Sequence, residues 1–209
     1  MSDRLASSPR SMNIVGLLLA AGLSVRMGTP KPLLLWCDST LIEYQVAQLK
    51  AAGAAEVIAV LGHEAEAVEP FAVRAGARIV LNPDYREGRA SSLRAGAGAV
   101  QTTCDAVVVL NVDQPRPSEI IVGLLEQHQA RQDLITVPIY QFRRGHPVVL
   151  DGSLLQELRN VQEETQGLRA VISRHQGSVS ECASDSPLVL LDINSPTDYE
   201  AAKQTYICG

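Results

Sequence analysis

Short apolar runs that alternate with stretches of helical periodicity limit the folds open to this chain more than any other feature. Residues 14–20, 57–61 and, apart from Asn111, 106–112 are apolar, without the polar alternation of a strand that has one wet face. Strands of this kind are buried on both faces, which requires a mainly parallel sheet with helices on each side. The sequence therefore predicts an α/β fold, a single-domain three-layer sandwich.

Helix signals fill the intervals between these runs. Thr40 and Glu43 form a capping-box pattern ahead of an apolar periodicity that Gly53 ends. Further helices are expected at 64–75, 91–100, 154–160, 168–174 and 197–206 and after Pro117, and further strands at 78–81, 134–139, 147–150 and 188–193. Because no repeat or linker interrupts this pattern, we expect one domain over residues 13–205, between a polar tail at 1–12 and a short tail at 206–209.

The charge balance argues against two classes of partner. The net charge is −5, which leaves no broad basic surface for nucleic acid or an anionic membrane. The apolar run that begins at Ile14 is too short to span a bilayer. We therefore expect a cytoplasmic protein without a nucleic-acid or membrane partner, in which a local cluster of cations holds any bound anion.

The loop after the first apolar run has the composition of a phosphate-binding loop. Residues 19–31 read Leu-Ala-Ala-Gly-Leu-Ser-Val-Arg-Met-Gly-Thr-Pro-Lys. Small residues let backbone N–H groups approach an anion, and Arg26 and Lys31 add two cations. The spacing fits neither a Walker A loop nor the Gly-x-Gly-x-x-Gly dinucleotide motif. The sequence therefore predicts a triphosphate-binding loop of another kind.

Polar residues follow other apolar runs at their carboxyl ends, where ligands collect in open α/β sheets. Asp113 follows the run 106–112, and Mg²⁺ is usually held by one or two carboxylates together with substrate phosphates. Asp192 and Asn194 lie near the end of the strand expected at 188–193, and one of them could supply the second metal ligand. The other interpretation is that this pair forms a turn and a helix cap ahead of Pro196.

Two further segments carry candidate binding groups. Asn82 precedes Gly88, Ser91 and Ser92, which lead into a helix whose N-terminus offers free N–H groups and hydroxyls to a nucleotide. Both serines could equally be plain helix caps. His146 lies beside a sharp turn and could bind a substrate or transfer a proton, although a structural histidine fits the local sequence as well.

Taken in order, these motifs resemble those of the MobA-like nucleotidyltransferases, and most of all the molybdenum cofactor cytidylyltransferase branch. The matching elements are the 19–31 loop, Asn82-Pro83, residues 88–93, Asp113-x-Pro115, Gly145-His146-Pro147 and residues 192–198. They extend over nearly the whole chain. The resemblance implies a Rossmann-like fold.

The same resemblance implies a reaction: transfer of CMP from CTP to the phosphate of molybdenum–molybdopterin, with Mg²⁺ as the cofactor and pyrophosphate as the second product. Ala20-Ala21-Gly22 matches the cytidine-using branch, whereas guanylyltransferases of this fold tend to have Ala-Gly-Gly. The expected nucleotide-binding residues are Leu19, Ala20, Ala21, Gly22, Ser24, Arg26, Lys31, Asn82, Gly88, Ser91 and Ser92. The expected catalytic residues are Arg26, Lys31 and Asp113, the metal ligands Asp113 and Asp192, and the acceptor-binding residues His146 and Asn194.

Three alternatives stay open at this point. An enzyme of the same fold could use a sugar or polyol phosphate as the acceptor, or GTP as the donor. A non-catalytic module could hold a nucleotide or pterin, but the combination of Arg26, Lys31 and Asp113 argues against it. A molybdoenzyme client is a further possible partner of the expected enzyme.

Overall fold

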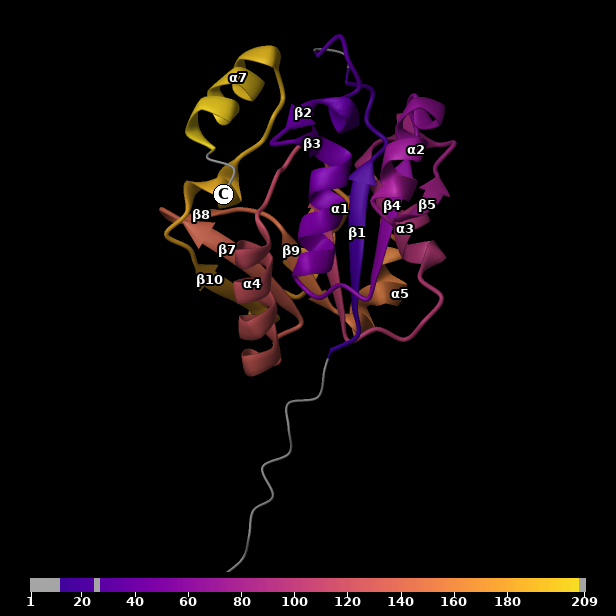
Figure 1. Ribbon diagram of the computed structural model, residues 1–209. Coiled ribbons are helices and arrows are strands. Elements are labelled where there is room, and N and C mark those ends of the chain that lie inside the picture. The colour runs from indigo at the N-terminus through magenta and orange to yellow at the C-terminus, as the bar shows by residue number, and fades with distance from the viewer. Residues whose placement is uncertain (1–11, 25–26, 207–209) are drawn as a thin grey trace, which may run out of the picture.

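One eight-stranded sheet forms the centre of the protein in the computed structural model, which describes residues 12–24 and 27–206 (Figure 1). Most of both expected tails falls outside these residues. The strand order is β10 (Val179–Ala183), β7 (Ile135–Tyr140), β9 (Val148–Asp151), β6 (Ala106–Asn111), β1 (Ile14–Ala20), β4 (Glu56–Leu61) and β5 (Arg78–Leu81), with β8 (Arg143–Arg144) paired to β7. β9 runs antiparallel to β6 and β7, β8 runs antiparallel to β7, and the other pairs are parallel. The expected mainly parallel sheet is confirmed.

Helices cover both faces of this sheet, as the three-layer prediction requires (Figure 1). One face packs against α1 (Leu41–Ala51), α2 (Ala65–Arg74) and α4 (Ser118–Arg131), and α7 (Pro196–Thr205) adds to the same core. The other face packs against α3 (Arg89–Ala99), α5 (Leu155–Leu158) and α6 (Leu168–Arg174). Single 3-10 turns lie at Lys31–Leu33, Tyr85–Glu87, Gly152–Leu154, Gln176–Ser178 and Pro187–Leu190, and β2 (Leu35–Trp36) pairs with β3 (Ser39–Thr40).

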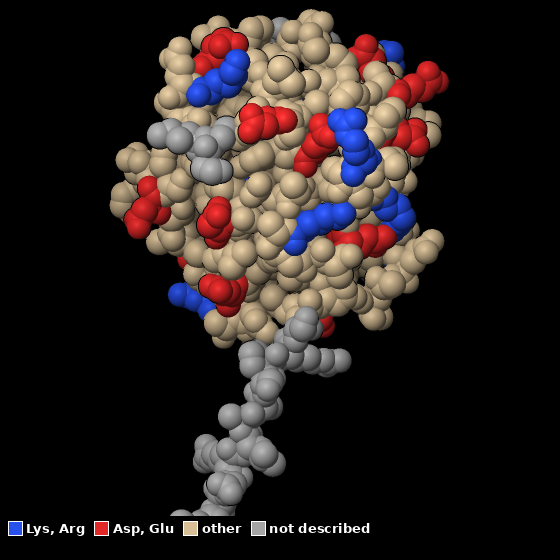
Figure 2. Space-filling view, in the orientation of Figure 1, with Lys and Arg blue, Asp and Glu red and all other residues tan. Residues whose placement is uncertain are grey.

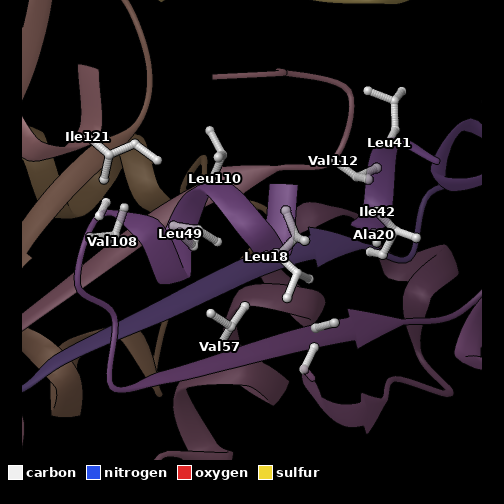
Figure 3. Close-up of a cluster of buried hydrophobic side chains, with 14 of the residues drawn as sticks. Leu18, Ala20, Leu41, Ile42, Leu49, Val57, Val108, Leu110, Val112 and Ile121 are labelled. Atoms are coloured by element: carbon white, nitrogen blue, oxygen red, sulfur yellow. The ribbon is translucent and has the colours of Figure 1, made fainter. Parts of the chain in front are cut away.

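Successive side chains of the central strands pack into the cores on opposite faces of the sheet. In β1, Leu18 faces the layer of α1 and α4, whereas Leu17 faces the layer of α3. Figure 3 shows the first of these cores, where side chains from β1, β4, β6, α1 and α4 meet, Leu49 and Ile121 among them. Each such side chain contributes about 1.5–3 kcal/mol when it is fully buried. Double-sided burial is therefore the physical reason for the continuously apolar runs.

The start and end of α1 follow the predicted signals. The Thr40 hydroxyl accepts a hydrogen bond from the Glu43 N–H, and the Glu43 carboxylate accepts one from the Thr40 N–H. Gly53, just after the helix, has φ of +95°, a left-handed conformation that favours glycine. Within α1, Gln45 reaches the end of β6 and the loop that follows it.

The strand expected at 188–193 is wrong. Residues Pro187–Leu190 form a 3-10 turn, and the chain continues without strand pairing. The segment is apolar because Val189 and Ile193 are fully buried. It does not pair as a strand, and the buried Arg116 donates hydrogen bonds to its Val189 and Leu191 carbonyls. The strand in this part of the chain is β10, which lies at the edge of the sheet beside β7. Much of β10 is exposed, so its sequence lacks the run of apolar residues that marks the central strands.

Smaller differences concern helix bounds. α5 is shorter than the helix expected at 154–160, because a 3-10 turn forms its beginning. Pro117 is the N-cap of α4 rather than its first residue. Neither difference moves a candidate site residue.

The surface carries charges of both signs. Figure 2 shows acidic and basic side chains interspersed on one face, without a broad basic patch there. No helix among the described residues is long and apolar enough to cross a membrane.

Candidate active site

Two adjoining cavities lie where β1 and β6 end. The smaller, of about 430 Å³, is lined by the loop after β1, by Lys31, by the segment that enters α3, and by Asp113 and Asn194. The larger, of about 760 Å³, is lined by the start of α3, by strand residues of β7 and β9, by the turn at His146 and by α6. Leu19, Arg89 and Asn111 line both, so ligands in the two cavities would be neighbours.

Lys31 joins the two candidate oxygen ligands of the smaller cavity. Its Nζ atom lies 2.7 Å from Asp113 Oδ2 and donates a hydrogen bond of 3.2 Å to Asn194 Oδ1. The Lys31 and Asp113 side chains are only 15% and 14% exposed, so water screens this ion pair less than it screens a surface pair. The fold thus brings together three residues of which the first and last, Lys31 and Asn194, are 163 positions apart in the sequence.

The loop after β1 presents its small residues to the same cavity. Leu19, Ala20, Ala21, Gly22 and Ser24 all line it. The Ser24 hydroxyl accepts a hydrogen bond of 3.0 Å from the Lys31 backbone N–H, so it closes the loop as well as facing the cavity. Arg26, the second expected cation, lies outside the described residues, and its role stays a prediction.

The predicted metal ligands have different surroundings. Asp113 lies on the wall of the smaller cavity, whereas Asp192 lines neither cavity and accepts a 2.6 Å hydrogen bond from Gln114 Nε2. Asp192 follows an irregular segment rather than a strand, because the expected strand 188–193 does not form. Asn194, expected on the acceptor side, instead shares the Lys31 ammonium with Asp113.

The donor groups fit a hard cation that also binds phosphates. Two oxygens, one carboxylate and one amide, already converge on a cation, the Lys31 ammonium. Within the described residues, no group of three or more His, Cys, Asp or Glu side chains could hold a metal alone. Such a site suits Mg²⁺, which commonly takes one or two protein ligands and completes its shell with substrate phosphates and water.

Some residues of the segment before α3 line the smaller cavity, and others hold the turn in place by hydrogen bonds. Asn82 Nδ2 donates to the hydroxyls of Ser91 (2.9 Å) and Ser92 (3.0 Å), and Ser91 donates to the Gly88 carbonyl. Ser92 and Gly88 line the smaller cavity, whereas Asn82 and Ser91 are buried and hold the turn from behind. Gly88 has φ of +107°, and a Cβ there would clash with the carboxyl group of Glu163.

His146 lies on the wall of the larger cavity in an environment that keeps it neutral. Burial, reinforced by the charge of Arg116, lowers the pKa of His146 to about 4. Its Nδ1 atom is buried and has no hydrogen-bond partner among the described residues. A neutral imidazole can bind an uncharged donor or acceptor group, but it adds no positive charge for a phosphate.

Sequence reasoning missed Arg116, the residue that links the segments of the site. Arg116 is fully buried, and its guanidinium donates to the carbonyls of Pro115, His146, Val189 and Leu191 over 2.9–3.0 Å. It therefore fastens together the loop after Asp113, the His146 turn and the segment that leads to Asp192. Its place between two prolines, just after a candidate ligand, was the available signal.

Two buried glutamines fix the loop that carries Asp113. Gln45 Nε2 donates to the carbonyls of Asn111 (3.2 Å) and Gln114 (2.6 Å), and Gln45 Oε1 accepts from the Arg116 N–H. Gln114 in turn accepts from Asn111 Nδ2 and donates to Asp192. These bonds satisfy backbone groups that a buried loop would otherwise leave unpaired.

Known proteins are similar to this chain in sequence and in fold. The family described as "MobA-like NTP transferase domain" matches residues 16–179. The nicotine blue oxidoreductase of Paenarthrobacter nicotinovorans is 35% identical over 83% of this chain and 89% of its own length. The molybdenum cofactor cytidylyltransferase of Escherichia coli K12 is 27% identical over 91% and 95%. The crystal structure of Rv0371c from Mycobacterium tuberculosis in complex with manganese superposes with a TM-score of 0.76 at 27% identity, covering 93% of this chain and all of that one. The family match extends over most of the chain and includes the loop, Lys31 and Asp113, so the protein belongs to the MobA-like nucleotidyltransferases.

Proposed function

We propose that the protein transfers CMP from CTP to the phosphate of molybdenum–molybdopterin and releases pyrophosphate in a Mg²⁺-dependent reaction. The observation that carries this proposal is the pair of adjoining cavities, with Lys31, Asp113 and Asn194 on the wall of the smaller one. Two substrates can bind side by side, and Lys31 with two candidate metal ligands, Asp113 and Asn194, lies in the cavity that the small-residue loop lines. This is the arrangement that transfer between two phosphates needs.

Each substrate has a distinct place in this proposal. CTP binds in the smaller cavity, where backbone groups of Leu19–Gly22 contact the base and sugar and where Lys31, with Arg26, binds the phosphates. The acceptor binds in the larger cavity beside His146. Asp113 and Asn194 are the residues that would hold Mg²⁺, and Asp192 is the candidate second carboxylate. When bound, Mg²⁺ supplies charge neutralisation on the phosphates of the donor.

The protein needs to do little covalent chemistry. A phosphate monoester is already ionised near neutral pH, so its attack on the donor requires no general base. The residues of the site instead align the two substrates and stabilise negative charge on the departing pyrophosphate. The rigid contacts of Gln45, Gln114 and Arg116 serve that alignment, because they fix the loop that carries Asp113.

Three finer parts belong to the same proposal. Selection of CTP rests on Ala21, the second small residue of Ala-Ala-Gly. A molybdoenzyme client would receive the product, and the reaction would take place in the cytoplasm. Support for this acceptor comes from the cytidylyltransferase relative.

A donor-by-acceptor assay tests the proposal directly. Pyrophosphate release is measured for CTP, GTP, ATP and UTP, each with molybdenum-loaded molybdopterin, a sugar phosphate, a polyol phosphate or no acceptor. We expect release with CTP and the molybdenum-loaded pterin alone. Release only with a sugar or polyol phosphate would contradict the acceptor, release only with GTP would contradict the donor, and tight CTP binding without any release would indicate a non-catalytic module.

A second candidate function is favoured by the 35% identity to a nicotine blue oxidoreductase. The sequence lacks the Gly-x-Gly-x-x-Gly motif of dinucleotide-binding domains, which argues against hydride transfer from a nicotinamide cofactor. Oxidation of reduced nicotinamide cofactors in the presence of nicotine blue measures this activity. We expect no oxidation above the protein-free rate, and a fast reaction would favour the second candidate.

Replacing Asp113 by asparagine should weaken binding of a divalent metal in the presence of CTP on the order of tenfold. The change keeps an oxygen at the same place but removes the negative charge that attracts a hard cation. Titration of Mn²⁺ followed by electron paramagnetic resonance measures the affinity. Asp133→Asn, a change outside both cavities, is the matched control and should leave the affinity unaltered. Equal affinities in the wild type and both variants would remove Asp113 from the metal site.

A further inference from the structure

Arg89 has a position that neither the proposed metal site nor the phosphate-binding loop explains. It is the first residue of α3 and one of three residues that line both cavities. The other two, Leu19 and Asn111, are uncharged. Among the described residues, Arg89 is therefore the cation that both ligands could contact at once.

No described residue pairs with the charge of the Arg89 guanidinium. Neighbouring arginines have partners: Arg86 lies over the ring of Tyr85, Arg94 donates to Glu87 and to the Val161 carbonyl, and Arg144 pairs with Glu181. The Arg89 side chain is exposed and makes no hydrogen bond or ion pair with any described residue. The nearby Glu163 carboxylate instead accepts a 2.7 Å hydrogen bond from the Ala90 N–H.

The placement of this cation is unfavourable for the helix itself. The N-terminus of a helix carries partial positive charge, so acidic residues stabilise it and a cation does not. The first turn of α3 itself contains no acidic residue, and the Glu163 carboxylate that accepts from the Ala90 N–H supplies the negative charge at this terminus. Arg89 is therefore not needed for the stability of the helix, and its place on the wall of both cavities points to an anionic ligand.

We propose that Arg89 binds the phosphates of both substrates at once and so holds them together for transfer. This inference rests on the proposed function, in which two anions must approach within bonding distance. A guanidinium has five N–H donors in a planar fork, enough to contact both the α-phosphate of the donor and the phosphate of the acceptor. Its charge offsets the repulsion between them.

The reaction step that Arg89 assists requires no proton transfer. An oxygen of the acceptor phosphate forms a bond to the α-phosphorus of the donor. The bond between that phosphorus and the oxygen bridging to the β-phosphate breaks, and the electron pair leaves with pyrophosphate. Arg89 acts by charge and hydrogen bonding.

Three variants test this role kinetically. Arg89→Met should lower kcat/KM for the acceptor about 100-fold and weaken binding of CTP alone by a smaller factor, about tenfold, because Lys31 and the loop after β1 also bind CTP in the proposed site. Arg89→Lys should recover part of the loss, because a single ammonium keeps the charge but cannot form the fork. Arg143→Met removes a cation from an exposed strand residue that lines neither cavity, and should behave as the wild type.

A binding experiment keeps the inference testable if no transfer is found. Inorganic phosphate is titrated into the CTP-loaded protein by calorimetry, for the wild type, Arg89→Met and Arg143→Met. We expect phosphate to bind the wild type and Arg143→Met, and Arg89→Met to bind it about tenfold more weakly or not at all. Phosphate affinity that is equal in Arg89→Met and Arg143→Met, or absent from the wild type, overturns the role of Arg89. Absence of pyrophosphate release from the wild type with every donor and acceptor overturns the proposed function instead.

Discussion

Replacing Lys31 by alanine is expected to lower kcat about 1000-fold while the protein stays folded. Lys31 is the described cation closest to the candidate metal ligands, with its Nζ atom 2.7 Å from Asp113. In the proposed reaction its charge stabilises the departing pyrophosphate, and that charge develops most strongly in the transition state. The loss should therefore appear in kcat more than in the KM for CTP, as measured by steady-state pyrophosphate release.

Metal binding separates this explanation from a simple collapse of the site. The alanine variant frees Asp113 from its ion pair, so Mn²⁺ affinity should be unchanged or higher than in the wild type. Lys50→Ala is the matched control: Lys50 bonds the Ala75 carbonyl at the surface, far from the cavities, and the variant should keep full activity. Near wild-type turnover by Lys31→Ala would exclude Lys31 from catalysis. Loss of Mn²⁺ binding together with activity would show that Lys31 only holds the site in shape.

The residues that chemistry requires were visible in the sequence because each follows a recognisable local feature. Lys31 ends a loop of small residues, and Asp113 comes shortly after the largely apolar strand β6. In a parallel sheet both features end at the same edge, so topology alone predicts their proximity. The Lys31–Asp113 contact confirms that reasoning.

The residues that hold those groups in place could not be predicted in the same way. Arg116, Gln45 and Gln114 act on backbone carbonyls and N–H groups of distant segments, and no local pattern marks such partners. The wrong strand at 188–193 has the same origin. Val189 and Ile193 are apolar because they are buried, but the hydrogen bonds of this segment go to Arg116, to the His146 N–H and to the Asp113 carbonyl instead of to a strand.

Replacing Arg116 by methionine is expected to reduce the free energy of unfolding by about 3 kcal/mol. The change removes the guanidinium from four carbonyls of three segments. The Pro115 and Val189 carbonyls keep a second donor, but those of His146 and Leu191 keep none among the described residues, and each buried acceptor left unpaired costs about 1–3 kcal/mol. Part of this cost is offset, because methionine removes a charge whose burial is itself unfavourable. Urea denaturation measures the change, and the exposed Arg131→Met, as the control, should stay within about 0.5 kcal/mol of the wild type.

His146 distinguishes loss of the Arg116 charge from general loosening of the fold. Burial is the largest cause of its low pKa, and the positive charge of Arg116 lowers that pKa further. In a folded Arg116→Met variant the pKa of His146 should therefore rise from about 4 but stay below the ordinary value of 6.5. Proton NMR titration of the imidazole C–H signals measures both values. If the pKa does not move, Arg116 does not act on His146 through charge, and if it reaches 6.5, the turn has opened to water. In the first case the contribution of Arg116 to the site is its four carbonyl bonds alone.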